Sequence, residues 1–150
     1  MNMRRPALFL SVKPTFAGRI FAGTKTIELR RVRPNVTSGD SALIYSSSPE
    51  MALLGSARIE EVLSGAPCDL WEHVKDDAGV SLDEYDDYFA GAATAIGIRL
   101  GGVQRLVSPI ALREIRVRWP WLRPPQSYRY VNAQIAPGGS ALQSLARPQQ

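Results

Sequence analysis

Cysteine and histidine are almost absent from this sequence, which holds one of each, Cys68 and His73. A single thiol excludes an internal disulfide and favours a reducing compartment, so we expect a cytoplasmic protein. Because no second cysteine or histidine lies near His73, the sequence predicts no metal site, and we expect no cofactor. Long apolar runs are lacking as well. Runs such as Ala7–Leu10 and Met51–Leu54 are far shorter than the ~20 residues that span a bilayer, so no membrane partner is expected.

The composition is that of a globular domain, because 45% of the 150 residues are hydrophobic and 21% are charged. This length suits one domain with one core. The charge is distributed unevenly: residues 1–35 carry a net +7, residues 60–90 a net −9 and residues 91–150 a net +7. We expect one basic and one acidic face, and a basic face suggests partners that bear phosphate. The alternative is that these charges only solvate the surface.

Hydrophobic spacing predicts several short strands and a few helices. Pro14 is suited to start a helix and Gly23 to end it, and Ser81 and Glu84 form a capping box before another helix. The expected strands are 8–13, 26–31, 41–45, 53–62 with a kink at Gly55, and 127–131. Residues 93–107 form either one bent strand or a pair of strands that turns at Gly101-Gly102. The expected helices are 14–22, 67–77 and 81–89, with a helical turn at 110–115. The predicted fold class is α+β, a small, mostly antiparallel β-barrel with flanking helices. We expect one domain over residues 1–131 and a loosely ordered tail over 132–150.

Residues 23–31, Gly-Thr-Lys-Thr-Ile-Glu-Leu-Arg-Arg, resemble the signature of the ASCH family within the PUA-like superfold. Further similarities are the Gly39-Asp40 turn before the strand at 42–45, the Leu70-Trp71-Glu72 helix and the segment 124–130. The resemblance covers about residues 8–131. It implies a five- to six-stranded barrel with a cleft beside the first helix, where the signature residues collect. Family members are proposed to bind RNA or other nucleic acids; one branch deacylates modified cytidine and another cleaves RNA.

The polar residues of the signature suit a nucleic-acid cleft. Strict alternation puts Thr26, Glu28 and Arg30 on one strand face, with Lys25 at its entrance. Arg30 can fork onto phosphate, Glu28 can accept from an exocyclic amine of a base, and Lys25 can neutralise phosphate or act as a base or nucleophile. The alternative is that Glu28 and Arg30 pair with each other on an exposed sheet face. The expected nucleic-acid-binding residues are Lys13, Arg19, Lys25, Thr26, Glu28, Arg30, Ser46, Ser47, Ser48, Gln126, Ser127, Tyr128 and Arg129.

These observations favour a non-enzymatic module that binds nucleic acid, RNA rather than DNA, or reads a flipped or modified base. The alternative is a hydrolase on the same cleft with Lys25 and Glu28 as catalytic residues. It would be a ribonuclease or an amidohydrolase of N-acylated nucleosides such as N4-acetylcytidine. In the deacylating branch the catalytic set is a lysine, a threonine and a glutamate. Lys25 matches the lysine, whereas Glu28 stands at the threonine position and the glutamate falls near Ala78. A third hypothesis is a protein-interaction adaptor that uses the acidic helices of residues 67–89. The sequence does not predict the oligomeric state.

Overall fold

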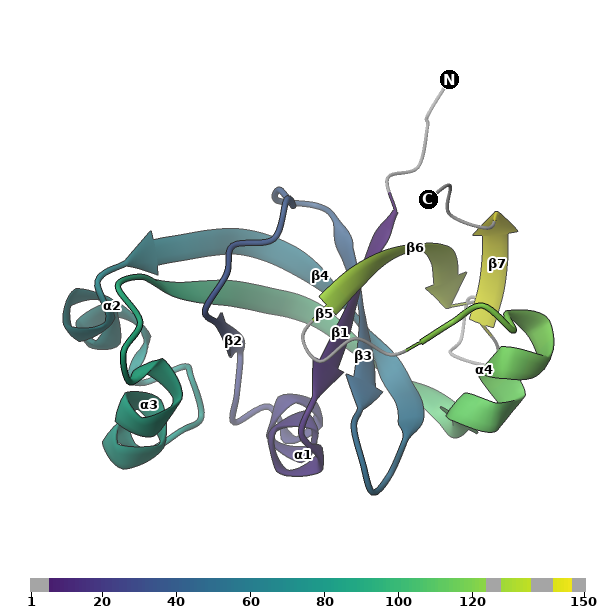
Figure 1. The fold of residues 1–150 in the computed structure, drawn as a ribbon, viewed down its shortest axis with the longest axis horizontal. Coiled ribbons are helices and arrows are strands. Elements are labelled where there is room, and N and C mark those ends of the chain that lie inside the picture. Colours follow the sequence, from purple (N-terminus) through teal and green to yellow (C-terminus); the bar gives the residue numbers. More distant parts are fainter. Residues whose placement is uncertain (1–5, 124–127, 136–141, 147–150) are drawn as a thin grey trace.

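The protein is described by a computed structural model covering residues 6–123, 128–135 and 142–146. Figure 1 shows its helices and strands. In chain order they are β1 (Ala7–Val12), α1 (Pro14–Ala22), β2 (Ile27–Arg30), β3 (Ser41–Ser46), β4 (Ala52–Gly65), α2 (Pro67–Val74), α3 (Leu82–Phe89), β5 (Ala95–Ala111), α4 (Leu112–Arg118), β6 (Tyr128–Ile135) and β7 (Leu142–Ala146). The α+β class predicted from the sequence is confirmed.

The strands form one mostly antiparallel sheet in the order β2-β5-β4-β3-β1-β6-β7. Among the described strands, only the pair β1–β3 runs parallel. A parallel pair needs a crossover between its strands. Here that connection holds α1 and β2, and it carries β2 out to the far edge of the sheet. Glu28 and Arg30 of the signature therefore lie on an edge strand, and Gly23 to Thr26 connect that strand to α1.

The longest strands, β4 and β5, pair along most of their length, and α2 and α3 connect them (Figure 1). Of the two alternatives for residues 93–107, the single bent strand is confirmed, because β5 continues through Gly101 and Gly102. Glycine is required at the second position, because Gly102 has φ +54°, which L side chains rarely adopt. The kink expected at Gly55 is confirmed by a register shift between Leu53 and Gly55.

Helix ends follow the sequence signals closely. Pro14 occupies the first turn of α1, and Gly23, with φ +83°, ends the helix in the left-handed conformation. The capping box at Ser81 and Glu84 forms with both of its hydrogen bonds. The helical turn expected at 110–115 begins two residues later, as α4. At the C-terminal side, β6 continues to Ile135 and pairs with β7; the domain boundary at residue 131 stays a prediction.

Three apolar clusters pack against the sheet. One joins α1 to residues such as Leu10 and Ile98, a second packs α4 against Phe9 and Tyr45, and a third holds α2 and α3 against Ile27 of β2. Figure 1 places the acidic helices α2 and α3 at one end of the molecule and α4 at the other. Since α4 carries three arginines and one glutamate, opposite charges gather at opposite ends. None of the described helices is long and apolar enough to cross a membrane.

Candidate nucleic-acid site

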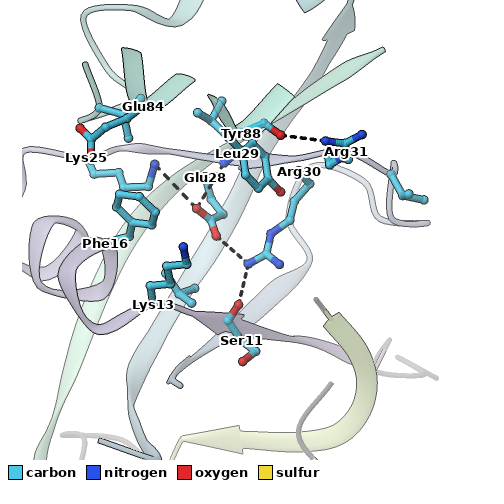
Figure 2. Close-up of a pocket in the computed structure, with 13 residues that line it drawn as sticks. Ser11, Lys13, Phe16, Lys25, Glu28, Leu29, Arg30, Arg31, Glu84 and Tyr88 are labelled. Carbon is cyan, nitrogen blue, oxygen red and sulfur yellow. Dashed lines mark hydrogen bonds and ion pairs between the residues drawn. The ribbon is translucent and has the colours of Figure 1, made fainter. Parts of the chain in front are cut away.

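A pocket of about 470 Å³ lies between the end of β1, α1, β2 and α3, where the sequence places the signature. Four cationic side chains and two carboxylates line it, which leaves a formal charge of +2. Figure 2 shows the residues that carry its chemistry. They are Lys13, Phe16, Lys25, Glu28, Arg30 and Tyr88. Both its size and its mixture of apolar and polar walls are those of a site for a small molecule.

Glu28 is the centre of a buried ion network on one side of this pocket. Its Oε2 accepts a hydrogen bond of 2.6 Å from Arg30 Nη2, and its Oε1 lies 3.7 Å from Lys25 Nζ. Oε1 also accepts from the backbone N–H of Leu29 at 3.2 Å. The exposed fractions of the Lys25, Glu28 and Arg30 side chains are 1%, 6% and 6%. One carboxylate therefore compensates two buried cations.

Arg30 connects the network to the neighbouring strand. The same Nη2 that binds Glu28 also donates to the backbone oxygen of Ser11 in β1, at 3.0 Å. The edge strand β2 pairs only with β5, so this hydrogen bond is an added link across the pocket between β2 and β1. The pairing of Glu28 with Arg30, which the sequence offered as the alternative to a ligand cleft, is present. The exposed sheet face that this alternative assumed is wrong, because all four residues of β2 are buried.

Lys25 is held by the chain that precedes α3. Its ammonium donates to the backbone oxygen of Ala78 at 2.7 Å. Burial lowers the pKa of Lys25, while Glu28 acts in the opposite direction and Arg30 adds to the lowering. Gly79 makes this close approach possible: a Cβ there would lie 2.6 Å from the Cβ of Lys25, and its φ of +62° favours glycine. The lysine is thus enclosed by residues more than fifty positions away in the sequence.

Local sequence explains how these side chains converge. Gly23 ends α1, and the N–H groups of Thr24 and Lys25 then bind the Arg19 carbonyl, which turns the chain toward β2. Along β2, alternation sends Ile27 and Leu29 into the apolar cluster under α2 and α3. It sends Glu28 and Arg30 to the pocket on the other face.

Lys13 differs from the buried cations Lys25 and Arg30 because it is exposed. It lies between β1 and α1, and Figure 2 shows its side chain directed into the pocket below Glu28. Among the described residues its ammonium has no hydrogen-bond or ion-pair partner. It is therefore available to a ligand, whereas Lys25 is already engaged.

Arg19 and Thr26, which were also expected to bind nucleic acid, do not line the pocket. Arg19 Nη1 donates to the Gly79 oxygen at 2.8 Å and pairs with Glu84 at 3.3 Å, so it fixes the start of α3 and does not line the pocket. Thr26 precedes β2 and is also absent from the lining. Its hydroxyl lies 3.5 Å from the Asp77 oxygen, and its backbone N–H donates to the same oxygen at 2.8 Å.

The hydroxyl-rich segment does not reach the pocket. Ser46, expected in a loop, is the last residue of β3; it is fully buried, and its hydroxyl has no hydrogen-bond partner among the described atoms. Ser47 and Ser48 lie in the turn that follows and do not line the pocket. Gln126 and Ser127 lie outside the described residues. The backbones of Tyr128 and Arg129 pair with Leu10 and Phe9 of β1, and their side chains lie outside the description.

Sequence reasoning missed two aromatic walls of the pocket. Phe16 follows the apolar spacing of α1, which is typical of a core residue, but it is only partly buried and lines the pocket. Tyr88 lies off the apolar stripe of α3 that Tyr85 and Phe89 form, and it is 40% exposed. An aromatic residue on the polar face of an amphipathic helix was the available signal. Burial against this pocket raises the pKa of Tyr88, with Arg30 opposing the change.

The catalytic set of the deacylating branch is incomplete here. Glu28, at the threonine position, is bound by Arg30 and lies beside Lys25; Ala78, where the resemblance puts a glutamate, is buried and contributes a backbone oxygen. In the described part of the chain no three His, Cys, Asp or Glu side chains gather into a group that could hold a metal. The pocket is therefore a cation-rich site with no metal ligand set of its own.

Known proteins agree with this architecture. The ASCH domain family matches residues 10–102. A protein of Zymomonas mobilis named ASCH domain-containing ribonuclease is 33% identical over 129 residues, which cover 85% of each protein. The crystal structure of ASCH from Zymomonas mobilis superimposes with a TM-score of 0.79 at 31% identity, covering 85% of this chain and 88% of that one.

A more distant structure, from Pseudomonas putida, shares the fold alone, with a TM-score of 0.52 at 17% identity over 89% of this chain and 93% of that one. The fold class inferred from the resemblance, a PUA-like α+β barrel with flanking helices, is confirmed. Since the family match spans most of the chain and the Zymomonas mobilis relative matches it in both sequence and structure, this chain belongs to the ASCH domain family.

Proposed function

We propose that this chain binds RNA and holds one nucleotide in the pocket between α1, β2 and α3. One observation carries the proposal: a positively charged pocket of about 470 Å³ presents an exposed lysine, which has no partner among the described residues, beside two aromatic rings. A nucleotide combines an anionic phosphate with a flat apolar ring, and these walls offer a partner for each. The name of the Zymomonas mobilis relative, a ribonuclease, supports RNA as the nucleic acid.

The contacts assign different roles to the two pocket lysines. Lys13 is exposed and unpartnered among the described residues, so it is the residue that meets a phosphate. Lys25 binds the Ala78 oxygen and lies beside Glu28, so it shapes the pocket and adds to its positive potential. The acceptor role expected for Glu28 toward a base is weakened, because Arg30, Leu29 and Lys25 already surround its oxygens.

A second candidate function, cleavage of the bound RNA at the same pocket, is favoured by the name of that relative. In cleavage by the neighbouring 2′-hydroxyl, a base takes the hydroxyl proton as the 2′-oxygen forms a bond to phosphorus. The bond from phosphorus to the 5′-oxygen breaks, water supplies a proton to that oxygen, and a 2′,3′-cyclic phosphate remains. Lys25 is the pocket amine whose pKa is lowered by burial, and it would act as that base in its neutral form. Glu28 would position it.

The three lysines of the chain provide a matched test. Fluorescence anisotropy of a labelled single-stranded RNA would be titrated with salt for the wild type, Lys13→Ala and Lys75→Ala. Lys75 is exposed and pairs with Glu72 on α2, outside the pocket. For a single strand, loss of one phosphate contact lowers the slope of log affinity against log salt by about 0.7. We expect this change in Lys13→Ala and no change in Lys75→Ala.

Each RNA sample would then be recovered and run on a denaturing gel. Intact RNA indicates binding alone. Shortened RNA with the wild type and intact RNA with Lys25→Met, at equal occupancy, would establish cleavage at this pocket. Absence of RNA binding at low salt, or equal losses in Lys13→Ala and Lys75→Ala, would contradict the proposed function.

A further inference from the structure

Arg105 is an exposed arginine on the second half of β5, outside the pocket described above. Its guanidinium carbon lies 4.7 Å from the centre of the Phe21 ring of α1, within cation–π distance. Among the described residues, this guanidinium has no hydrogen-bond or ion-pair partner. Arg105 therefore combines a fixed position on an aromatic ring with N–H donors that no described carboxylate or carbonyl uses.

The Phe21 ring that supports Arg105 rests on the backbone of Gly55, which lies opposite Arg105 in the register of β4 and β5. A Cβ at residue 55 would lie 2.7 Å from this ring and would also collide with the backbone oxygen of Gln104. Glycine at this position therefore lets the ring pack closely on the sheet. A planar guanidinium that stacks on an aromatic ring keeps its donor fork available. Because the stack exists before a ligand arrives, binding costs less side-chain ordering.

Arg105 and the pocket lie on different sides of α1. Phe16, which lines the pocket, and Phe21 are five residues apart, which separates them by about 7.5 Å along the helix and by more than a third of a turn around it. Figure 1 shows α1 between α3, which borders the pocket, and α4 at the far end. A ligand that contacts both Lys13 and Arg105 must cross a helix about 10–12 Å in diameter. A strand of several nucleotides can do this, whereas a single nucleotide cannot.

The charges of the surrounding elements favour this path for an anionic strand. Residues 60–90, which include α2 and α3, carry a net −9 and repel phosphate. In the opposite direction, β5 runs from Arg105 to Ala111 and leads into α4, which carries three arginines and one glutamate. A strand that leaves the pocket is therefore repelled by the acidic end and attracted over α1 toward Arg105.

We propose that Arg105, supported by Phe21, is a second phosphate-binding point for a single-stranded RNA of which one nucleotide occupies the pocket. This inference rests on the proposed function and extends the ligand from one nucleotide to a strand. Grooves that follow a single strand in other domains hold about 4–16 nucleotides. The guanidinium donates charge-assisted hydrogen bonds to a phosphate on the far side of α1. Lys13 meets a phosphate at the pocket itself.

The deciding comparison uses two labelled ligands, a uridine dinucleotide, which is confined to the pocket, and an oligouridylate of about 12 nucleotides. Fluorescence anisotropy of each is titrated with salt for the wild type, Arg105→Gln and Arg58→Gln. Arg58 is the matched control, because it is an exposed arginine of the paired strand β4 that already binds Glu60 at 3.1 Å. Loss of one phosphate contact lowers the slope of log affinity against log salt by about 0.7. We expect this change for Arg105→Gln with the longer ligand alone, and no change for Arg58→Gln.

Phe21→Leu tests the support of the guanidinium while keeping its charge. We expect weaker binding of the oligouridylate and unchanged binding of the dinucleotide, because only the longer ligand reaches Arg105. A general disturbance of the fold would weaken both ligands. Thermal unfolding of each variant verifies that it folds.

The outcomes separate this inference from the proposed function. If Arg105→Gln keeps the wild-type slope with the oligouridylate while Lys13→Ala weakens both ligands, the inference is overturned and the proposed function stands. Equal losses with both ligands in Arg105→Gln would also overturn the inference. Binding of neither ligand by the wild type would overturn both proposals. A change in the oligomeric state of Arg105→Gln without RNA, measured by size-exclusion chromatography, would assign Arg105 to contact with a second copy and overturn the inference.

Discussion

Replacing Glu28 by glutamine removes the charge on which two buried cations depend. The substitution keeps the size of the side chain and an oxygen that can accept from the Leu29 N–H. It leaves Lys25 and Arg30, whose side chains are 1% and 6% exposed, without their carboxylate. Breaking a buried ion pair by removing one partner costs about 3–5 kcal/mol, because the remaining charge is desolvated and uncompensated. We expect a loss of this size in the free energy of unfolding of Glu28→Gln.

Urea denaturation followed by tryptophan fluorescence measures this loss, with Glu72→Gln as the control. Glu72 also pairs with a lysine, at 2.8 Å, but both side chains are exposed and solvated. We therefore expect no measurable effect from Glu72→Gln. Adding Lys25→Met to Glu28→Gln removes one of the stranded cations, so the double variant should lose less stability than the two single variants together, by about 0.5–3 kcal/mol. If Glu28→Gln proves no more costly than Glu72→Gln, the buried network does not stabilise the fold as argued.

Three further perturbations test other parts of the site and its support. Gly79→Ala should destabilise the protein by more than the ~1–2 kcal/mol that a left-handed conformation costs an L residue, because the new Cβ would also meet Lys25 and Thr24. Chemical denaturation measures this loss, and an unchanged free energy of unfolding would contradict the close approach. Because the pKa of Lys25 is lowered in the folded protein, the unfolded chain binds the Lys25 proton more tightly. The stability of the wild type relative to Lys25→Met should therefore rise as pH increases toward 10.5. A difference in the free energy of unfolding that stays constant over a denaturation series at increasing pH would refute this. Burial raises the pKa of Tyr85 to about 12, so the free energy of unfolding of the wild type should fall between pH 10 and 12. Tyr85→Phe should lack that fall. At pH 7 the variant should be about 1 kcal/mol less stable, because it lacks the hydrogen bond from the Tyr85 hydroxyl to the Pro67 oxygen.

The sequence predicted the polar face of β2 but not its burial. Alternation is a local property, and it correctly put Glu28 and Arg30 side by side. The cover over that face comes from Phe16 of α1 and Tyr88 of α3, and no local pattern shows that α3 packs there. The contact between Lys25 and the Ala78 carbonyl could not be predicted either, because a backbone acceptor does not depend on the type of side chain.

Helix boundaries were predictable because their signals are local. Pro14, Gly23 and the Ser81–Glu84 box all act within one helical turn of themselves, and each lies where expected. The conformation at Gly101-Gly102 stayed open for the opposite reason. Two glycines are compatible with a turn or with a bent strand, and here β5 continues through both while it pairs with β4. Which of these applies depends on a strand some forty residues away in the chain.

Charge alone could not separate ligand-contacting residues from structural ones. Lys13, Arg19 and Lys25 look equivalent in the sequence, yet Arg19 is tied to Gly79 and Glu84, Lys25 is enclosed, and only Lys13 is exposed and unpartnered among the described residues. The three residues can be distinguished only when the position of α3 is known. Glu84, a partner of Arg19, belongs to this helix, and the Ala78 and Gly79 oxygens that bind Lys25 and Arg19 lie just before it.

Photo-crosslinking tests the central claim, that RNA binds in the pocket, most directly. A single-stranded RNA containing 4-thiouridine would be irradiated with the protein, and the modified residues mapped by mass spectrometry. We expect adducts on the peptides that contain Phe16 and Tyr88, reduced by excess unlabelled RNA. Adducts confined to the arginine-rich surface of α4, at the opposite end from α3, would contradict the claim.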